Sequence, residues 1–276
     1  MLSFCLLLSC AALAEPLRLV SAGASVTALV QELELQPLLV GVDSTSMPTV
    51  GDTLPNIGYQ RQLSAEGILS LRPDVLLGSE EMGPPQVLAQ LREAGVEVIE
   101  LSARADLPTL YANIRQIGSR FAQSAGAEQL ISRIEQQVLA LPGIPAQRPR
   151  ALFLLSHSAG SLLVAGADTA GDSLIQLGGM YNPLAVQFGQ YRSLSAEGLL
   201  QLRPHWLITT TQSLDTAGGK QGLLALQPAL EATPAAQSNQ VIGIEGALLV
   251  GGFSPHIVDT LGQLRRAAAS PGAVAH

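Results

Sequence analysis

Short apolar runs alternate with amphipathic stretches along the first hundred residues. The apolar runs predict strands over 17–20, 38–42, 75–77 and 96–101. Between them, apolar side chains recur at helical spacing and predict helices over 26–35, 64–71 and 87–94. Strands that are apolar throughout are buried on both faces, so this alternation is typical of a parallel sheet covered by helices.

The second half of the chain follows the same plan. Apolar runs predict strands over 151–155, 162–164, 206–208 and 241–244. Helical patterns fall at 172–177, at 195–202 and in a C-terminal helix from about residue 255. We therefore expect a second α/β unit with a parallel sheet of its own.

One long helical pattern, residues 108–141, separates the two halves. Its apolar side chains lie on one face, at Leu110, Ile114, Ile117, Phe121, Leu130, Ile134 and Val138. Gly118 and Gly126 weaken the helix, so the pattern leaves room for a break, and Pro142 ends it. We expect one long backbone helix here, stiff enough to limit closure of the two halves.

An internal repeat supports two similar lobes. Residues 59–73 and 190–204 share the strings LSAEG and LRP and the arginine before them, without a gap, at an offset of 131 residues. A period of this length indicates two related lobes, because solenoid repeats are shorter. The predicted organisation is a lobe at 15–107, a connecting helix at 108–141 and a lobe at 142–276. We expect two Rossmann-like lobes with a ligand cleft between them.

The first fourteen residues are typical of a signal peptide. Leu2 to Leu8 is apolar and Ala12-Leu13-Ala14 is a small-x-small cleavage pattern. The run is shorter than the roughly 20 residues that a membrane-spanning helix needs. A lipoprotein signal with Cys10 as the lipidated residue is the alternative. Both cysteines fall in this segment, so the mature chain would have neither thiolate metal sites nor cysteine catalysis.

Charge and motifs exclude several function classes. The formal net charge of −7 argues against a nucleic-acid partner. The chain lacks the G-x-G-x-x-G and P-loop patterns of nucleotide-binding enzymes, and it has neither G-x-S-x-G nor H-E-x-x-H. Its four histidines are too few and too scattered to favour a zinc or manganese receptor. These absences argue against such nucleotide-dependent enzymes, against these hydrolase motifs and against that kind of metal receptor.

Three segments carry a resemblance to a known family: 39–46 (LVGVDSTS), 58–67 (GYQRQLSAEG) and 165–170 (AGADTA). Over nearly the whole mature chain, the sequence resembles the helical-backbone periplasmic binding proteins of haem, cobalamin and siderophore importers. Within that family it is most similar to the periplasmic haem-binding proteins. It departs from the family pattern at Thr27-Ala28, where an acidic residue often follows the threonine.

The resemblance implies a monomeric periplasmic protein that captures haem. It would deliver the haem to the permease subunits of an ABC transporter in the inner membrane. Cobalamin or a ferric siderophore is the alternative cargo, and a Rossmann-like enzyme is a distant third reading.

Tyr59 is the main candidate for a haem iron ligand. It lies before the predicted helix 64–71, at the edge where the strands end. Phenolate is a hard anionic donor suited to ferric iron, and tyrosine is a known axial haem ligand. Arg61 lies two residues on, and in an extended segment it would face the same side. The resemblance implies that Arg61 stabilises the phenolate or pairs with a haem propionate. The alternative is that Tyr59 packs under its loop and Arg61 is a solvated surface charge.

Lobe two offers further candidates. His157 follows the strand 151–155 and is a second candidate iron ligand, with a polar loop histidine as the alternative. Tyr191 aligns with Gln60 rather than with Tyr59, so we expect it to line the cleft or brace its loop. Arg192 is a second candidate for a propionate, and Phe253 is a candidate cleft wall, with core packing as the alternative.

Glu66 and Glu197 occupy equivalent places in the repeat. Ser64 and Ser195 precede them as expected N-caps, so each glutamate lies in a first helical turn, where the helix dipole favours a carboxylate. That stabilisation is the simplest interpretation. The resemblance implies that the pair, one on each lobe, docks on arginines of the transporter.

Overall fold

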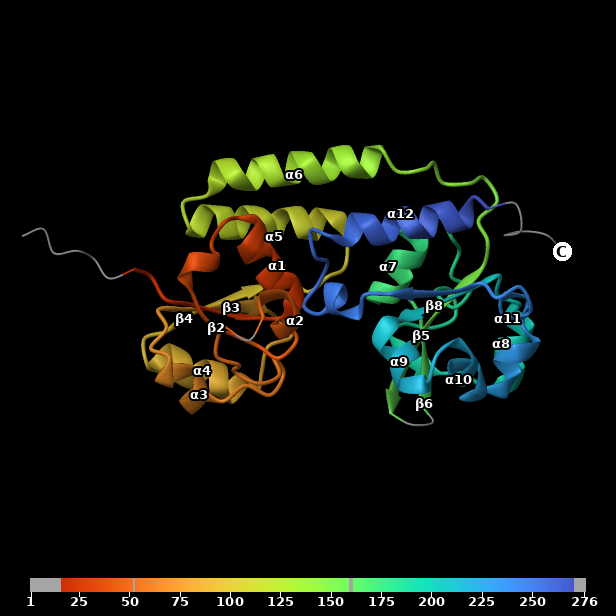
Figure 1. Ribbon diagram of the computed structural model, residues 1–276, viewed down its shortest axis with the longest axis horizontal. Coiled ribbons are helices and arrows are strands. Elements are labelled where there is room, and N and C mark those ends of the chain that lie inside the picture. Colours follow the sequence, from red (N-terminus) through yellow and green to blue (C-terminus); the bar gives the residue numbers. More distant parts are fainter. Residues whose placement is uncertain (1–15, 52, 159–160, 271–276) are drawn as a thin grey trace, which may run out of the picture.

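The computed structural model describes residues 16–51, 53–158 and 161–270, so the expected signal peptide at 1–14 and Cys10 lie outside the described residues. Two α/β lobes stand side by side below a layer formed by three helices, α5 (Leu107–Arg120), α6 (Ser124–Leu139) and α12 (Ile257–Ala268) (Figure 1). In the described part of the chain, no helix is both long and apolar enough to cross a membrane.

Lobe one contains a four-stranded sheet in the order β2-β1-β3-β4, and its pairings are all parallel, as predicted. Its strands are β1 (Leu19–Ala22), β2 (Leu39–Val42), β3 (Val75–Ser79) and β4 (Glu97–Leu101). The helical elements are α1 (Ala24–Glu32), η1 (Gln36–Leu38), α2 (Met47–Val50), α3 (Ala65–Ser70) and α4 (Pro85–Glu93).

Lobe two contains a five-stranded sheet in the order β7-β6-β5-β8-β9. Its strands are β5 (Ala151–Ser158), β6 (Ser161–Ala165), β7 (Tyr191–Ser193), β8 (Trp206–Thr210) and β9 (Val241–Ile244). β5, β8 and β9 pair in parallel, but β6 pairs antiparallel with both β5 and β7. The prediction of a fully parallel second sheet was therefore wrong. Too few residues separate β5 from β6 for a crossover, so only antiparallel pairing is open to them.

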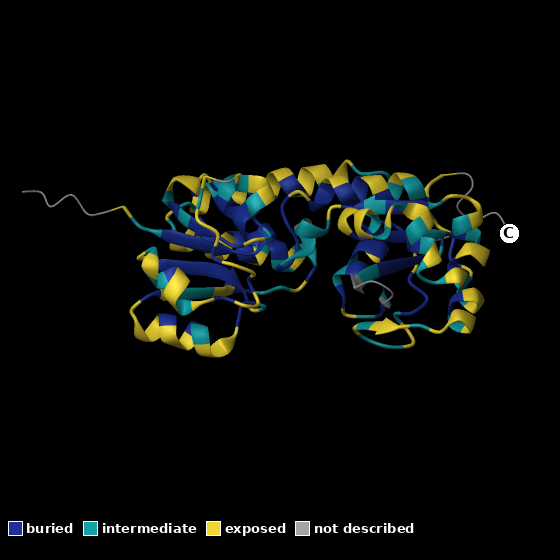
Figure 2. Cartoon of the chain, turned by 60° about the horizontal axis from the view of Figure 1, so that its bottom comes forward, coloured by how far each residue is buried: buried dark blue, intermediate teal, exposed yellow. Residues whose placement is uncertain are grey.

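The remaining helical elements cover lobe two, except α12, which belongs to the helical layer above both lobes. They are α7 (Ala170–Leu177), α8 (Ala196–Leu202), α9 (Thr211–Ala217), α10 (Lys220–Ala225), η2 (Pro228–Ala232), α11 (Pro234–Gln237), η3 (Gly246–Leu249) and α12 (Ile257–Ala268). Figure 2 shows the sheets as the buried layer and the outer helix faces as exposed.

The connecting element is a helical hairpin and not the single helix that we expected. α5 (Leu107–Arg120) ends at a turn in which Ala122 has a φ of 55°, and α6 (Ser124–Leu139) runs back over α5 (Figure 1). The break falls between the two glycines that weakened the pattern. Gly118 allows the close approach, because a Cβ there would lie 2.5 Å from the Cβ of Ala127.

The largest hydrophobic cluster runs through both lobes. It includes Leu77 of lobe one, Phe153 of lobe two and the inner faces of α5, α6 and α12. A crossing segment, residues 245–253, returns from lobe two to lobe one, where Ser25 donates its N–H to the carbonyl of Val250 (3.3 Å) and its hydroxyl to that of Gly252 (2.8 Å). Because close-packed interiors resist sliding, this shared core holds the lobes in a fixed arrangement.

The internal repeat has the same local structure in both lobes. Ser64 and Ser195 accept hydrogen bonds from Gly67 and Gly198 and are the N-caps that the sequence predicts. Each helix ends at a left-handed arginine, Arg72 with a φ of 47° in lobe one and Arg203 with 44° in lobe two.

A second arginine binds each of these helix ends. Arg18 donates from Nε to the carbonyl of Arg72 (3.0 Å), and Arg150 donates likewise to the carbonyl of Arg203 (3.1 Å). These contacts satisfy carbonyls that have no partner within the helix.

Candidate ligand-binding cleft

A cleft of about 1100 Å³ opens between the two lobes. It lies at the carboxyl ends of the strands, where α/β folds bind ligands, and its volume suits a large one. Lobe one and the crossing segment contribute Tyr59, Gln60, Arg61, Glu81, Ala103, Arg104, Ala105, Asp106, Leu107, Pro108, Gly246, Leu249 and Val250. Lobe two contributes Phe153, Leu155, Asp168, Thr169, Ala170, Asp172, Ser173, Gln176, Leu177, Gln190, Tyr191 and Thr210.

Tyr59 projects from a loop whose backbone is held on both sides. The carbonyl of Gly58 accepts the N–H of Ser44 (2.8 Å), and the carbonyl of Gln60 accepts the N–H of Gly83 (3.0 Å). Gly58 has a φ of +88°, a conformation that glycine adopts without strain. The Tyr59 side chain is 41% exposed, and none of the described residues forms a hydrogen bond with its hydroxyl. The phenol is therefore presented to the cleft on a fixed support.

Arg61 also lines the cleft, although residues 59–62 form a turn and not the extended segment that we assumed. The N–H of Gln62 donates to the carbonyl of Tyr59 at 2.7 Å. Arg61 Nη2 forms an ion pair with Glu81 Oε1 at 2.6 Å. The hydrogen bond that Arg61 donates to Glu81 raises the pKa of Arg61, and the Coulombic effects of Glu81 and Tyr59 act in the same direction. Arg61 therefore carries a permanent positive charge close enough to influence the phenol.

Gln60, between these two residues, points into the protein. Its side chain is fully buried, and neither of its amide atoms has a hydrogen-bond partner among the described residues. It packs against Gly23, where a Cβ would lie only 2.8 Å from Gln60 Oε1. A buried amide without hydrogen-bond partners lowers the free energy of unfolding, so Gln60 destabilises the native state.

On lobe two, Tyr191 both lines the cleft and braces it. Its hydroxyl accepts the N–H of Gly171 at 3.2 Å, in the first turn of α7. Its ring lies 6.5 Å from that of Phe153, centroid to centroid. Burial raises the pKa of the Tyr191 phenol. Tyr191 is therefore held in place as a neutral phenol, which makes it a poor metal ligand.

Arg192 and Phe253 lie outside the cleft, so the expectations for both are corrected. Arg192 follows Tyr191 on β7 and faces the other side of the strand, where its guanidinium lies over the Phe188 ring at 5.3 Å. Phe253 is only 3% exposed and belongs to the core shared by the two lobes. His157 lies within β5 at a register shift against β6, but its side chain lies outside the described residues.

Residues 19–248 match the family model for periplasmic binding proteins. The chain belongs to the periplasmic binding protein family. The structure of this chain is similar to the crystal structure of the periplasmic heme-binding protein HutB of Vibrio cholerae, with 35% sequence identity and a TM-score of 0.86. The match covers 92% of this chain and 99% of that one. For the apo form of the periplasmic heme-binding protein RhuT from Roseiflexus sp. RS-1, the identity is 32%, the TM-score 0.87, and the coverage 94% and 99%.

Two curated relatives of this periplasmic binding protein are more distant. A vitamin B12-binding protein of Pectobacterium atrosepticum is 23% identical, over 74% of this chain and 75% of that protein. An uncharacterized ABC transporter substrate-binding lipoprotein of Bacillus subtilis, YvrC, is also 23% identical, over 71% of this chain. The match spans 64% of the lipoprotein's length. Both curated relatives are thus ligand-binding proteins by name.

Several cleft residues of this periplasmic binding protein escaped the sequence analysis. Glu81 and Arg104 are the main ones, together with Asp106, which pairs with Arg104. Arg104 follows the predicted strand 96–101, and a charged residue placed directly after a buried strand is a signal that could have identified it. In the described chain, no group of three or more His, Cys, Asp or Glu side chains could hold a metal ion.

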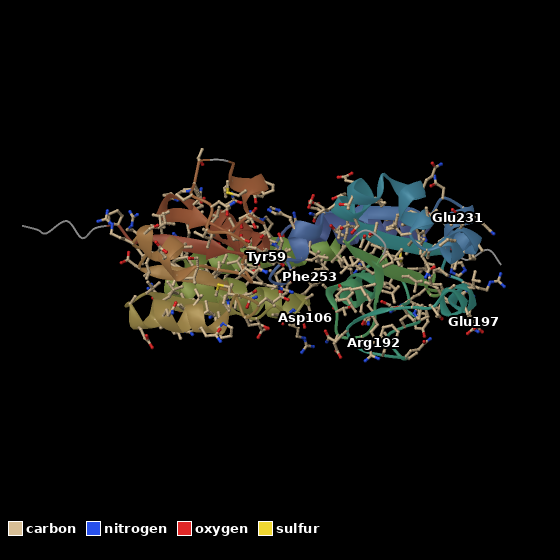
Figure 3. The ribbon with its side chains drawn as sticks, turned by 90° about the horizontal axis from the view of Figure 1, so that it is seen from below. Tyr59, Asp106, Arg192, Glu197, Glu231 and Phe253 are labelled. Carbon is tan, nitrogen blue, oxygen red and sulfur yellow. The ribbon has the colours of Figure 1, made fainter. Side chains whose placement is uncertain are left out.

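Glu66 and Glu197 lie where the repeat predicts them, in the first turns of α3 and α8. Both are exposed, and neither has an ion-pair partner among the described residues. Figure 3 shows Tyr59 near the middle of the molecule and Glu197 at the far end of lobe two. The two glutamates are therefore separate from the cleft, one on each lobe, and available to another protein.

Proposed function

We propose that this protein is a periplasmic receptor that binds haem in its cleft and delivers it to an ABC transporter. Tyr59 would bind the ferric iron, and Arg61 would stabilise the phenolate. The haem-binding proteins HutB and RhuT, at 35% and 32% identity over nearly their whole length, support haem as the cargo. Binding and delivering a ligand do not require its chemical conversion, so we infer that the protein is not an enzyme.

The position of Tyr59 is the observation that carries this proposal. Its side chain lines the cleft, its hydroxyl has no hydrogen-bond partner among the described residues, and Arg61 lines the cleft from the same turn. Phenolate is a hard anionic donor that suits ferric iron, and a neighbouring guanidinium would balance its charge. Apolar surface from Leu155 and Leu177 on the facing wall suits a flat macrocycle.

Hemin titration followed by absorption spectroscopy tests this assignment. We expect Tyr59→Phe to weaken hemin binding at least about tenfold, because it removes the iron ligand and keeps the ring. Tyr181→Phe is the matched control, since Tyr181 is similarly exposed (44%) but lies outside the cleft. Equal affinities for hemin in the Tyr59→Phe and wild-type proteins would refute Tyr59 as the ligand.

Cobalamin is the second candidate cargo, favoured by the vitamin B12-binding relatives. Cobalamin brings its own lower axial ligand and has no need of a phenolate. If cyanocobalamin bound tightly, and equally well to wild type and Tyr59→Phe, while hemin did not bind, the second candidate would replace the first.

Export and delivery complete the proposal. We infer that residues 1–14 direct the chain to the periplasm, with lipidation of Cys10 as the alternative mode of anchoring. We further propose that Glu66 and Glu197 contact the permease, which fits their exposure on equivalent helices of the two lobes. A monomer suffices for this role, and a possible second iron ligand at His157 stays a prediction.

A further inference from the structure

Positive charge in the cleft is confined to one wall. Among the described lining residues, the cationic side chains are Arg61 and Arg104, and both belong to lobe one. Lobe two contributes the carboxylates Asp168 and Asp172 instead, and its Arg192 is turned away from the cleft. A ligand with carboxylate groups would therefore find cationic partners only on the side of lobe one, where Glu81 pairs with Arg61 and Asp106 pairs with Arg104.

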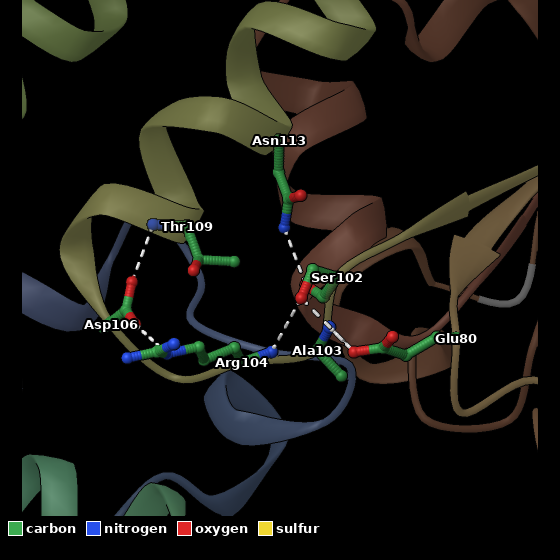
Figure 4. A network of polar contacts seen from close by, with 7 residues as sticks. All are labelled: Glu80, Ser102, Ala103, Arg104, Asp106, Thr109 and Asn113. Carbon is green, nitrogen blue, oxygen red and sulfur yellow. Dashed lines mark hydrogen bonds and ion pairs between the residues drawn. The ribbon is translucent and has the colours of Figure 1, made fainter.

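The loop that carries Arg104 is held rigidly. Glu80 accepts the N–H of Ala103 at 2.9 Å and the hydroxyl of Ser102 at 3.2 Å, as Figure 4 shows. The carbonyl of Ser102 accepts a hydrogen bond from Asn113 on α5 at 2.9 Å. Because the backbone is ordered before any ligand arrives, binding through Arg104 requires only the side chain to be ordered.

The guanidinium of Arg104 is available to a ligand. Its side chain is 79% exposed, and its ion pair is with Asp106, which is also the N-cap of α5 and accepts the N–H of Thr109 at 2.7 Å. Exposed ion pairs are weak, so exchanging Asp106 for a ligand carboxylate costs little. Arg61 is the less exposed of the two arginines, at 53%, and it donates to Glu81.

We propose that Arg104 binds one carboxylate of the ligand, and that Arg61 and Arg104 together orient a dicarboxylate toward the lobe-one wall. This inference rests on the proposed function, in which the ligand is haem and the two carboxylates are its propionates. One guanidinium cannot pair with two separate carboxylates and also stabilise the Tyr59 phenolate, so a second cation on the same wall completes the site. Arginine suits this role because it offers a planar pair of donors.

Hemin and its dimethyl ester, which has the same iron and ring but no carboxylates, are the probes for Arg104. We expect Arg104→Gln to weaken hemin binding about 3- to 5-fold, the scale of an exposed ion pair, and to leave binding of the ester unchanged. Arg104→Lys should restore part of the loss for hemin. Arg115→Gln is the matched control, because Arg115 is an exposed, ion-paired arginine of α5 outside the cleft.

A substitution of Asp106 provides a second test, in which hemin affinity should increase and not decrease. Asp106→Asn keeps an N-cap acceptor but removes the charge that competes for Arg104. We expect it to tighten hemin binding about twofold, since an exposed ion pair is weak, and to have no such effect when Arg104 is already glutamine.

The outcomes separate the inference from the proposed function. Should hemin binding depend on Tyr59 but not on Arg104, or should Arg104→Gln weaken hemin and ester equally, the role of Arg104 is wrong and the haem assignment stands. If hemin binding is absent, or is indifferent to Tyr59, the proposed function itself fails.

Discussion

At the scale of single residues, Gln60 is in the least favourable environment of the cleft. A buried amide without partners costs about 1–3 kcal/mol, whereas an apolar side chain of similar shape carries no such penalty. We expect Gln60→Met to raise the free energy of unfolding by about 1 kcal/mol in urea denaturation. A decrease would mean that the amide has a partner in solution, such as a buried water.

His205 is the second residue whose chemistry has a measurable consequence. Its Nδ1 accepts the N–H of Arg150 at 3.0 Å, the role that the Asp74 carboxylate has toward Arg18 in lobe one. Burial lowers the pKa of His205, and Arg150 and Arg203 act in the same direction. The native state therefore favours neutral histidine, and His205 has a structural role at the start of β8.

This lowered pKa predicts a loss of stability in mild acid. As the pH falls below about 6.5, the unfolded chain takes up a proton at His205 before the native state does. The free energy of unfolding should then decrease by at most about 1.4 kcal/mol per pH unit until the native pKa is reached. His205→Asp, which copies Asp74, should remove this component when urea denaturation is compared at pH 7.5 and 5.5. Parallel losses in the two proteins would contradict the assignment.

At the scale of elements, the α5–α6 hairpin offers a matched pair of glycines. A Cβ at Gly118 would meet Ala127 at 2.5 Å, while one at Gly126 would meet only Gln123 Oε1 at 3.6 Å. Alanine favours a helix over glycine by up to about 1 kcal/mol, but forcing packed helices apart costs about 1–3 kcal/mol. We expect Gly118→Ala to lower the melting temperature and Gly126→Ala to raise it. Shifts of the same sign would show that the hairpin contact is not tight.

The elements also show where sequence patterns stop being informative. The four strands and the three longer helices of lobe one were predicted to within a few residues, because each has its own apolar period, whereas the short elements η1 and α2 were missed. β7 was missed because Tyr191, Arg192 and Ser193 have no strand-like pattern, and they form a strand only through pairing with β6. The break between α5 and α6 was anticipated at its glycines, but the reversal of direction depends on tertiary packing.

The residues of the candidate site were also predicted only in part. Tyr59 and Arg61 could be identified because they adjoin a repeated segment that the resemblance also covers. Glu81 and Arg104 lie on other loops, with no repeat to mark them, and only the topology brings them to the cleft. Arg192 and Phe253 were wrongly assigned to the cleft. The direction in which Arg192 points from the short strand β7, and the burial of Phe253 in the crossing segment, both depend on residues that are distant in sequence.

At the scale of the whole molecule, the two lobes should present their glutamates to the permease as one unit. Reversing both charges, Glu66→Arg with Glu197→Arg, should reduce haem uptake by whole cells more than tenfold, because repulsion from basic partner residues replaces attraction. Hemin affinity of the purified variant should stay within about twofold of wild type, since the charges are outside the cleft and surface charges are screened.

A glutamate on the opposite side of the molecule provides the control. Glu135→Arg changes an exposed residue of α6, the helix that lies above α5 and both lobes in Figure 1, and should leave uptake intact. Normal uptake by the doubly reversed protein would show that the glutamates have no docking role.

The hydrophobic core that includes both Leu77 and Phe153 affects how receptor molecules would compete for the importer. A receptor whose lobes close little presents much the same outline whether its binding site is vacant or filled. Vacant copies must then compete with filled ones for each importer, and the importer has to recognise the cargo itself. When cargo is scarce, the rate of import would fall as receptor is produced in excess, so the ratio of receptor to importer becomes a quantity that the cell must control.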